Sequence, residues 1–183
     1  SRNTGTTEIG HRGEPGIHAV MDGEEENPII IKAYPGDEVQ LIGGIDGGTP
    51  TLSTLPTEFV NPAIGTEWDI ETDYIIIDGF KIYGAATLGH TTGSVLKNCE
   101  IWGGGDSEFG CCVRVEEATN CNVRNNKVHD NVNSGTSNGS PLLMGYDSTN
   151  VVIENNEFYN ADTHAVLYKD DPESLKIRYN IFR

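Results

Sequence analysis

The side chains best suited to chemistry lie in three short segments in the second half of the chain. These segments are residues 113–116, 143–146 and 166–169. Each alternates between inward and outward positions if it forms a β-strand. With Val113 and its counterparts pointing inward, Arg114, Glu116, Tyr146 and Lys169 share an outward face. Such a face offers a base and a ring on which a sugar could stack.

The turns beside these segments add histidines and acids. His129 and Asp130 precede the second segment, Asp162 and His164 precede the third, and Asp170 follows it. Carboxylates are ligands for hard cations such as Ca²⁺, and histidine serves as a general base. Structural explanations stay open for all of them, because Asp suits turns and charged side chains form salt bridges.

A repeat indicates how these side chains are positioned. Five eight-residue segments align without gaps, with intervals of 19, 27, 30 and 24 residues between them. They are residues 75–82, 94–101, 121–128, 151–158 and 175–182. One apolar column of the alignment contains Ile77, Leu96, Val123, Ile153 and Ile177. Repeats this short leave no room for a crossover helix, so each strand must stack on its counterpart.

Three further columns support the stacking. Asn126, Asn156 and Asn180 share one position, where their amides can form a hydrogen-bonded ladder. Outward charges alternate in sign along the stack, which favours this register. The alternating columns are Lys81, Glu100, Lys127 and Glu157, and Arg124, Glu154 and Arg178. The predicted fold is all-β: a single-stranded right-handed parallel β-helix, which is a solenoid.

We expect one domain over residues 1–183. Residues 1–26 are predicted to be an N-terminal loop or cap, residues 44–66 a surface loop, and residues 74–183 the regular rungs. The last repeat leaves an apolar layer at its end. We therefore expect either a fragment of a longer β-helix or end-to-end self-association.

Composition excludes several function classes. The formal net charge of −16 argues against nucleic-acid binding, which needs basic surface. No apolar run approaches the roughly 20 residues of a membrane span, so no membrane partner is expected. The four cysteines show no zinc-binding spacing, and whether any of them form disulfides stays open.

Residues 27–36 (NPIIIKAYPG) resemble a signature near the start of many pectate-lyase-like β-helix proteins. The later VRNN and IENN rungs look like the repeats of that superfamily. That superfamily includes polysaccharide lyases, uronate epimerases, glycoside hydrolases and non-enzymatic surface proteins, and the fold alone does not choose among them. In its lyases, the resemblance implies Ca²⁺ bound by acids and Lys or Arg as the base. For such chemistry, the outward face and its turns offer catalytic Lys169, Arg114 and His164, substrate-binding Tyr146, Glu116 and His129, and metal-binding Asp130, Asp162 and Asp170.

The leading hypothesis is a secreted, periplasmic or cell-surface protein that engages an acidic, uronate-containing polysaccharide and, if it is an enzyme, acts by β-elimination. A non-catalytic carbohydrate-binding or structural solenoid is the alternative, and a glycoside hydrolase is a third.

Overall fold

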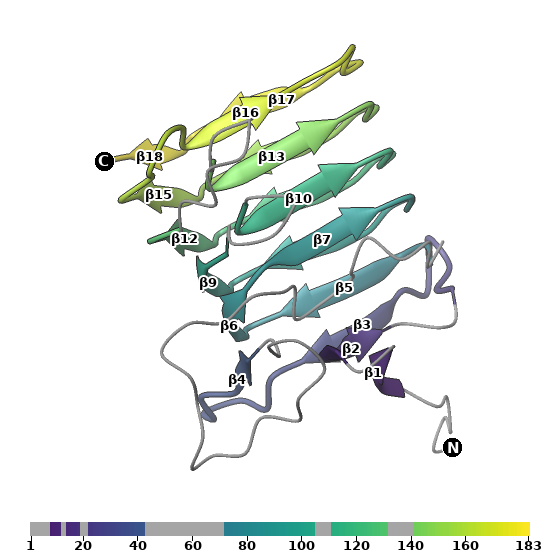
Figure 1. The fold of residues 1–183 in the computed structure, drawn as a ribbon. Coiled ribbons are helices and arrows are strands. Elements are labelled where there is room, and N and C mark those ends of the chain that lie inside the picture. The colour runs from purple at the N-terminus through teal and green to yellow at the C-terminus, as the bar shows by residue number, and fades with distance from the viewer. Residues whose placement is uncertain (1–7, 12–13, 19–21, 43–71, 105–110, 132–140) are drawn as a thin grey trace.

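Three parallel β-sheets run the length of a solenoid, and successive strands of each sheet come from successive rungs (Figure 1). The computed structural model describes residues 8–11, 14–18, 22–42, 72–104, 111–131 and 141–183. The first sheet contains β3 (Ile29–Lys32), β5 (Ile75–Asp78), β8 (Val95–Lys97), β11 (Asn122–Arg124), β14 (Val152–Glu154) and β17 (Lys176–Arg178).

The second sheet contains β4 (Gln40–Ile42), β6 (Lys81–Gly84), β9 (Glu100–Gly103), β12 (Lys127–His129), β15 (Glu157–Tyr159) and β18 (Ile181–Phe182). The third contains β7 (Ala86–Gly89), β10 (Val113–Glu116), β13 (Leu143–Tyr146) and β16 (Val166–Tyr168). The predicted stacking of short strands on their counterparts is therefore confirmed.

Each eight-residue repeat contains two short strands with a bend between them. The bend places one residue in the left-handed backbone region, for example Asn98, Asn125 and Asn155 with φ of 55° to 56°. Asparagine tolerates this conformation better than most residues. The bend turns the chain from the first sheet into the second, so one repeat supplies strands to both.

The apolar column lies inside the solenoid as predicted. Ile77 pairs with Leu96, and Val123 pairs with Leu96 and Ile153 in the parallel register. These four side chains belong to the buried core, in which every rung covers its neighbour. Ile177 occupies the same column in the last rung but is 44 % exposed, because no described residues pack over it.

The asparagine column forms the expected ladder. Asn126 donates from Nδ2 to Asn156 Oδ1 over 3.1 Å, and Asn156 donates in the same way to Asn180 over 3.1 Å. Each Nδ2 also donates to a backbone carbonyl of the first sheet. The ladder therefore satisfies polar groups that the bend would otherwise bury without partners.

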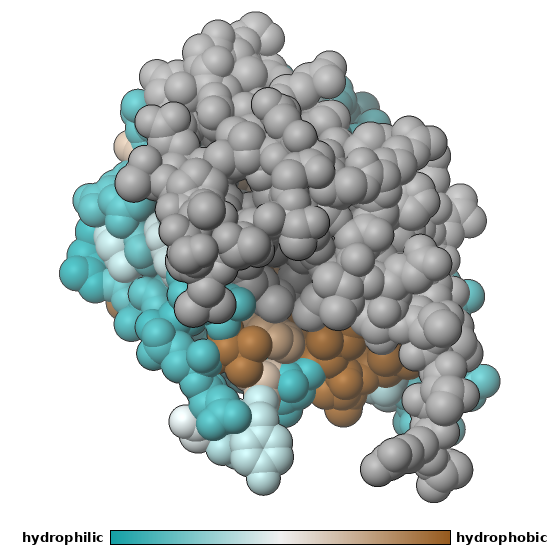
Figure 2. Space-filling model, turned by 60° about the horizontal axis from the view of Figure 1, so that its bottom comes forward, coloured by the Kyte–Doolittle hydropathy of each residue, from teal (hydrophilic) through white to brown (hydrophobic). Residues whose placement is uncertain are grey.

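The N-terminal region contains one pair of short strands. Within residues 1–26, which were expected to be a loop or cap, β1 (Glu8–His11) and β2 (Glu14–His18) pair antiparallel. The predicted loop at residues 44–66 lies outside the described residues. The two described ends of the stack carry apolar surface, seen in brown at the β3 end in Figure 2 and formed by Ile177, Ile181 and Phe182 at the other.

All four cysteines are buried and free. Burial raises the pKa of the Cys99 and Cys121 thiols to about 11, so both stay protonated and unreactive at neutral pH. Cys99 and Cys121 belong to the core cluster and act as small apolar residues.

Candidate functional site

The outer side of the third sheet brings together four of the predicted site residues. Glu116 pairs with Tyr146 in the register of β10 and β13. Gly145 pairs with Tyr168, and the Lys169 backbone N–H donates to the Gly145 carbonyl, which places Lys169 next to Tyr146 one rung further on. We call Arg114, Glu116, Tyr146 and Lys169 the second-strand face.

Arg114 is held firmly within this face. Its Nη2 contacts Glu116 Oε2 at 2.7 Å and Oε1 at 2.8 Å, and its guanidinium lies 5.3 Å from the centre of the Tyr146 ring. Only 7 % of the residue is exposed although it points away from the core. A charge-assisted ion pair and a cation–π contact thus fix both the cation and the ring before any ligand arrives.

Tyr146 keeps its proton in this environment. Burial raises the pKa of its hydroxyl, although the positive charge of Arg114 acts in the opposite direction. The hydroxyl donates to the sulfur of Met144 two residues earlier in β13. A half-buried, protonated tyrosine offers a ring surface and a hydroxyl, a combination suited to sugars.

His129 and Asp130 lie elsewhere, on and after β12 in the second sheet. The His129 ring stacks between Trp102 and Tyr159, with ring centres 5.9 and 4.5 Å apart. Its Nδ1 is 2.6 Å from Asp130 Oδ2, and this contact and the Asn160 amide hold the pKa of Asp130 below its usual range. His129 thus lies on the second sheet and not on the third sheet with the second-strand face, and its predicted substrate-binding role stays a prediction.

The three predicted metal ligands do not gather at one point. Both carboxylate oxygens of Asp130 already accept hydrogen bonds, from His129 and Asn160. Asp162 lies in the turn before β16, and Asp170 lies in the turn after it, at opposite ends of that strand. Within the described ranges, no three acidic, histidine or cysteine side chains form a potential metal site. As placed, these three side chains do not together surround a calcium ion, and Ca²⁺ binding by the chain stays a prediction.

The predicted catalytic His164 is exposed in the same turn before β16. Its carbonyl accepts a hydrogen bond from the Leu142 backbone N–H over 2.9 Å, so its backbone joins two rungs. The structure thus gives His164 a backbone role, whereas its predicted catalytic role is untested.

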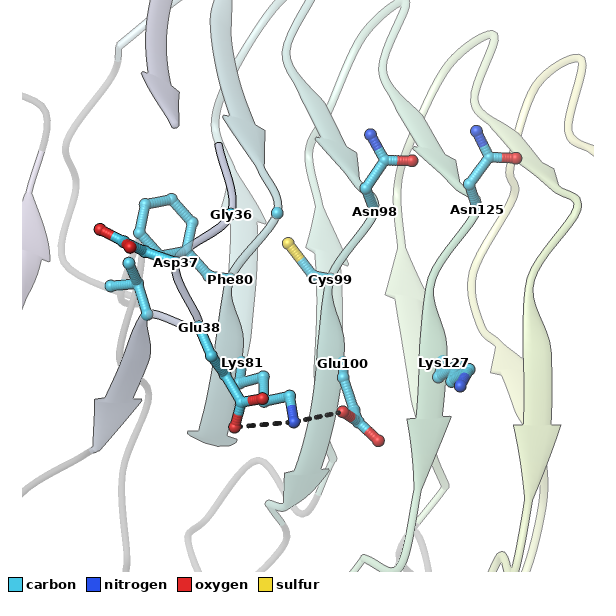
Figure 3. A pocket seen from close by; sticks show the side chains of 12 residues that line it. Gly36, Asp37, Glu38, Phe80, Lys81, Asn98, Cys99, Glu100, Asn125 and Lys127 are labelled. Carbon is cyan, nitrogen blue, oxygen red and sulfur yellow. Dashed lines mark ion pairs between the residues drawn. The ribbon is translucent and has the colours of Figure 1, made fainter. Parts of the chain in front are cut away.

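A cavity of about 480 Å³ opens on the other side of the solenoid, at the bend between the first and second sheets. Residues 36–39 form one wall, and Lys81 joins Glu38 at 2.9 Å to Glu100 at 3.5 Å (Figure 3). The sequence identified Lys81 and Glu100 as a charge column. It missed the cavity because residues 36–39 occur once and have no counterpart in the repeat.

Comparison with family models identifies the right-handed β-helix region over residues 81–183, and the chain belongs to this family. Proteins with this fold are often carbohydrate-active. The predicted right-handed parallel β-helix is confirmed, at the coarse level of the pectate-lyase-like superfamily. Comparisons with curated proteins and with solved structures gave no match.

Across the described part of the chain, no helix has the length and apolar character required to cross a bilayer.

Proposed function

We propose that the protein binds an acidic, uronate-containing polysaccharide on the second-strand face. The observation that supports this most directly is the aligned row of Glu116, Tyr146 and Lys169, with Arg114 held beside the Tyr146 ring. Parallel strands lie about 4.8 Å apart, so the row runs along the solenoid axis. A chain of sugars lying along this axis could contact several rungs at once.

Local charge matters here because the whole chain is strongly acidic. A net charge of −16 repels a polyanion at long range, and salt screens that repulsion over roughly 8 Å at physiological ionic strength. Binding then depends on short contacts with positive groups. Lys169 supplies such a group on this face, whereas Arg114 is buried and paired with Glu116, and the tyrosine ring supplies apolar contact with a sugar ring.

The geometry supports binding better than turnover. Arg114, one of the predicted catalytic groups, is engaged with both oxygens of Glu116. In that state its charge is largely compensated and its donors are partly used. β-Elimination is the second candidate function, favoured by the placement of Lys169 beside Tyr146, where a base could reach a sugar bound on the ring.

The proposal is tested by measuring the affinity of the chain for pectate, alginate and glycosaminoglycans by calorimetry. We expect Tyr146→Ala and Lys169→Gln each to weaken binding of the preferred polymer by about tenfold, because each removes one short contact. Tyr146→Phe should retain most of the affinity, since it keeps the ring. The unsaturated-uronate absorbance of the same mixtures reports β-elimination.

Tyr179→Ala and Lys176→Gln are matched controls, because both residues are exposed on the last repeat, away from this face. They should leave affinity within about twofold of the unaltered chain. Equal affinity in all variants, with melting temperatures unchanged, would remove the second-strand face as the binding surface.

A further inference from the structure

The two lysines that line the cavity beside residues 36–39 differ in their ion pairs. Lys81, Glu100, Lys127 and Glu157 follow one another in register on the outer side of the second sheet. In a simple ladder each lysine would pair with the acids on both sides. Lys81 does contact two acids, Glu38 and Glu100.

Lys127 makes no ion pair with any described residue, although an acid lies on each side of it. Glu100 already faces Lys81 at 3.5 Å and His129 Nε2 at 3.5 Å. Glu157 forms its ion pair with Arg183 at the end of the neighbouring strand. The carboxylates nearest Lys127 are therefore committed to other groups, which leaves its exposed ammonium at the edge of the cavity (Figure 3).

The rest of the cavity lining suits a ligand with many hydroxyl groups. Its walls alternate acceptors and donors, with Glu38 and Glu100 on either side of the Lys81 ammonium. Ligand cavities in proteins span roughly 300–1,000 Å³, and this one lies within that range at about 480 Å³. A hydroxyl group can both donate to carboxylates and accept from ammonium groups.

We propose that this cavity is a second binding site, which takes an acidic sugar residue and places its anionic group on Lys127. The anion pairs with the Lys127 ammonium in place of Glu100 and Glu157, which form ion pairs with other groups. The sugar hydroxyls reach the Glu38 and Glu100 carboxylates on the other side. This site lies on the second sheet, so it is separate from the second-strand face on the third sheet.

A titration of ¹⁵N-labelled protein with a trimer of galacturonic acid tests the proposal. We expect the amide signals of Asn98, Asn125 and Lys127 to shift, since all three residues line the cavity. Lys127→Gln should weaken this binding at least tenfold, because a charge-assisted contact is lost. Lys176→Gln is the matched control, an exposed lysine outside the cavity, and should change the affinity less than twofold.

Three further arms make the outcome decisive. A neutral trimer of galactose should bind at least tenfold more weakly, and a sulfated galactose trimer distinguishes a sulfate from a carboxylate as the preferred anion. Tyr146→Ala should leave the shifts at Asn125 and Lys127 intact, so failure here is separable from failure of the second-strand face. Unchanged affinity in folded Lys127→Gln, or equal binding of the neutral trimer, would overturn the proposal.

Discussion

At the scale of single residues, Asn156 joins three rungs through its side chain. Its Oδ1 accepts from the backbone N–H and Nδ2 of Asn126, while its Nδ2 donates to Val123 O and Asn180 Oδ1. Asn156 is almost fully buried, so water could not take its place as a hydrogen-bond partner if the side chain were removed. We expect Asn156→Ala to lower the free energy of unfolding by about 2–4 kcal/mol, measured by urea denaturation.

Asn150 provides the comparison for Asn156. It also donates to the asparagine of the rung before it, over 2.6 Å to Asn120 Oδ1, but this pair is exposed. Glycine at this position accepts the φ of 54°, so Asn150→Gly should cost less than about 1 kcal/mol. Similar losses in the two variants would show that burial of the ladder contributes little.

At the scale of elements, β13 and β16 fit together through complementary sizes. Gly145 and Tyr168 are paired in register, and a Cβ atom at Gly145 would collide with the Tyr168 ring. Gly145→Ala should therefore destabilise the chain by about 1–3 kcal/mol. In the double variant with Tyr168→Leu the two losses should not add, because the smaller side chain makes room; thermal unfolding of all three variants measures this.

Additive losses would show that the cost of alanine at Gly145 arises from the backbone rather than from the Tyr168 ring. The comparison matters for the second-strand face, because Gly145 directly precedes Tyr146 and its carbonyl accepts from the Lys169 N–H. Packing inside the solenoid thus sets the alignment of the row outside it.

At the scale of the whole molecule, each rung contacts mainly its neighbours, so stability is distributed along one axis. Rungs between β8 and β15 are covered on both sides, whereas Phe182 in β18 is 52 % exposed and stacks on Phe158 alone among described rings. In dilute solution, amide hydrogen exchange should be slowest in β11 and β14 and at least tenfold faster in β17 and β18.

Protein concentration separates two explanations of the exchange pattern. End-to-end self-association, which stays a prediction, would slow exchange in β17 and β18 as concentration rises, because a second copy would cover their unpaired edges. Equal protection of β11 and β18 in a dilute monomer would contradict the expected gradient.

The sequence by itself determined the rungs, because a β-solenoid repeats the same local pattern. The column from Ile77 to Ile153, the asparagine ladder and the row of Glu116, Tyr146 and Lys169 all follow from aligned repeats and the two-residue period of strands. In each case the neighbour in space is the matching residue of the next repeat, so alignment alone identifies it.

Only the tertiary structure decided on which sheet a residue near a bend lies and which side chains it contacts there. His129 is close in sequence to the second-strand face but turns onto another sheet, where Trp102 and Tyr159 enclose it. The cavity wall at Glu38 depends on the position of a loop that occurs only once in the repeat. The pairing of Glu157 with Arg183 rather than with Lys127 depends on the position of the Arg183 side chain. The direction of the chain at a bend and the position of a loop that occurs once produce no repeated pattern in the sequence. Both result from packing between segments rather than from local periodicity.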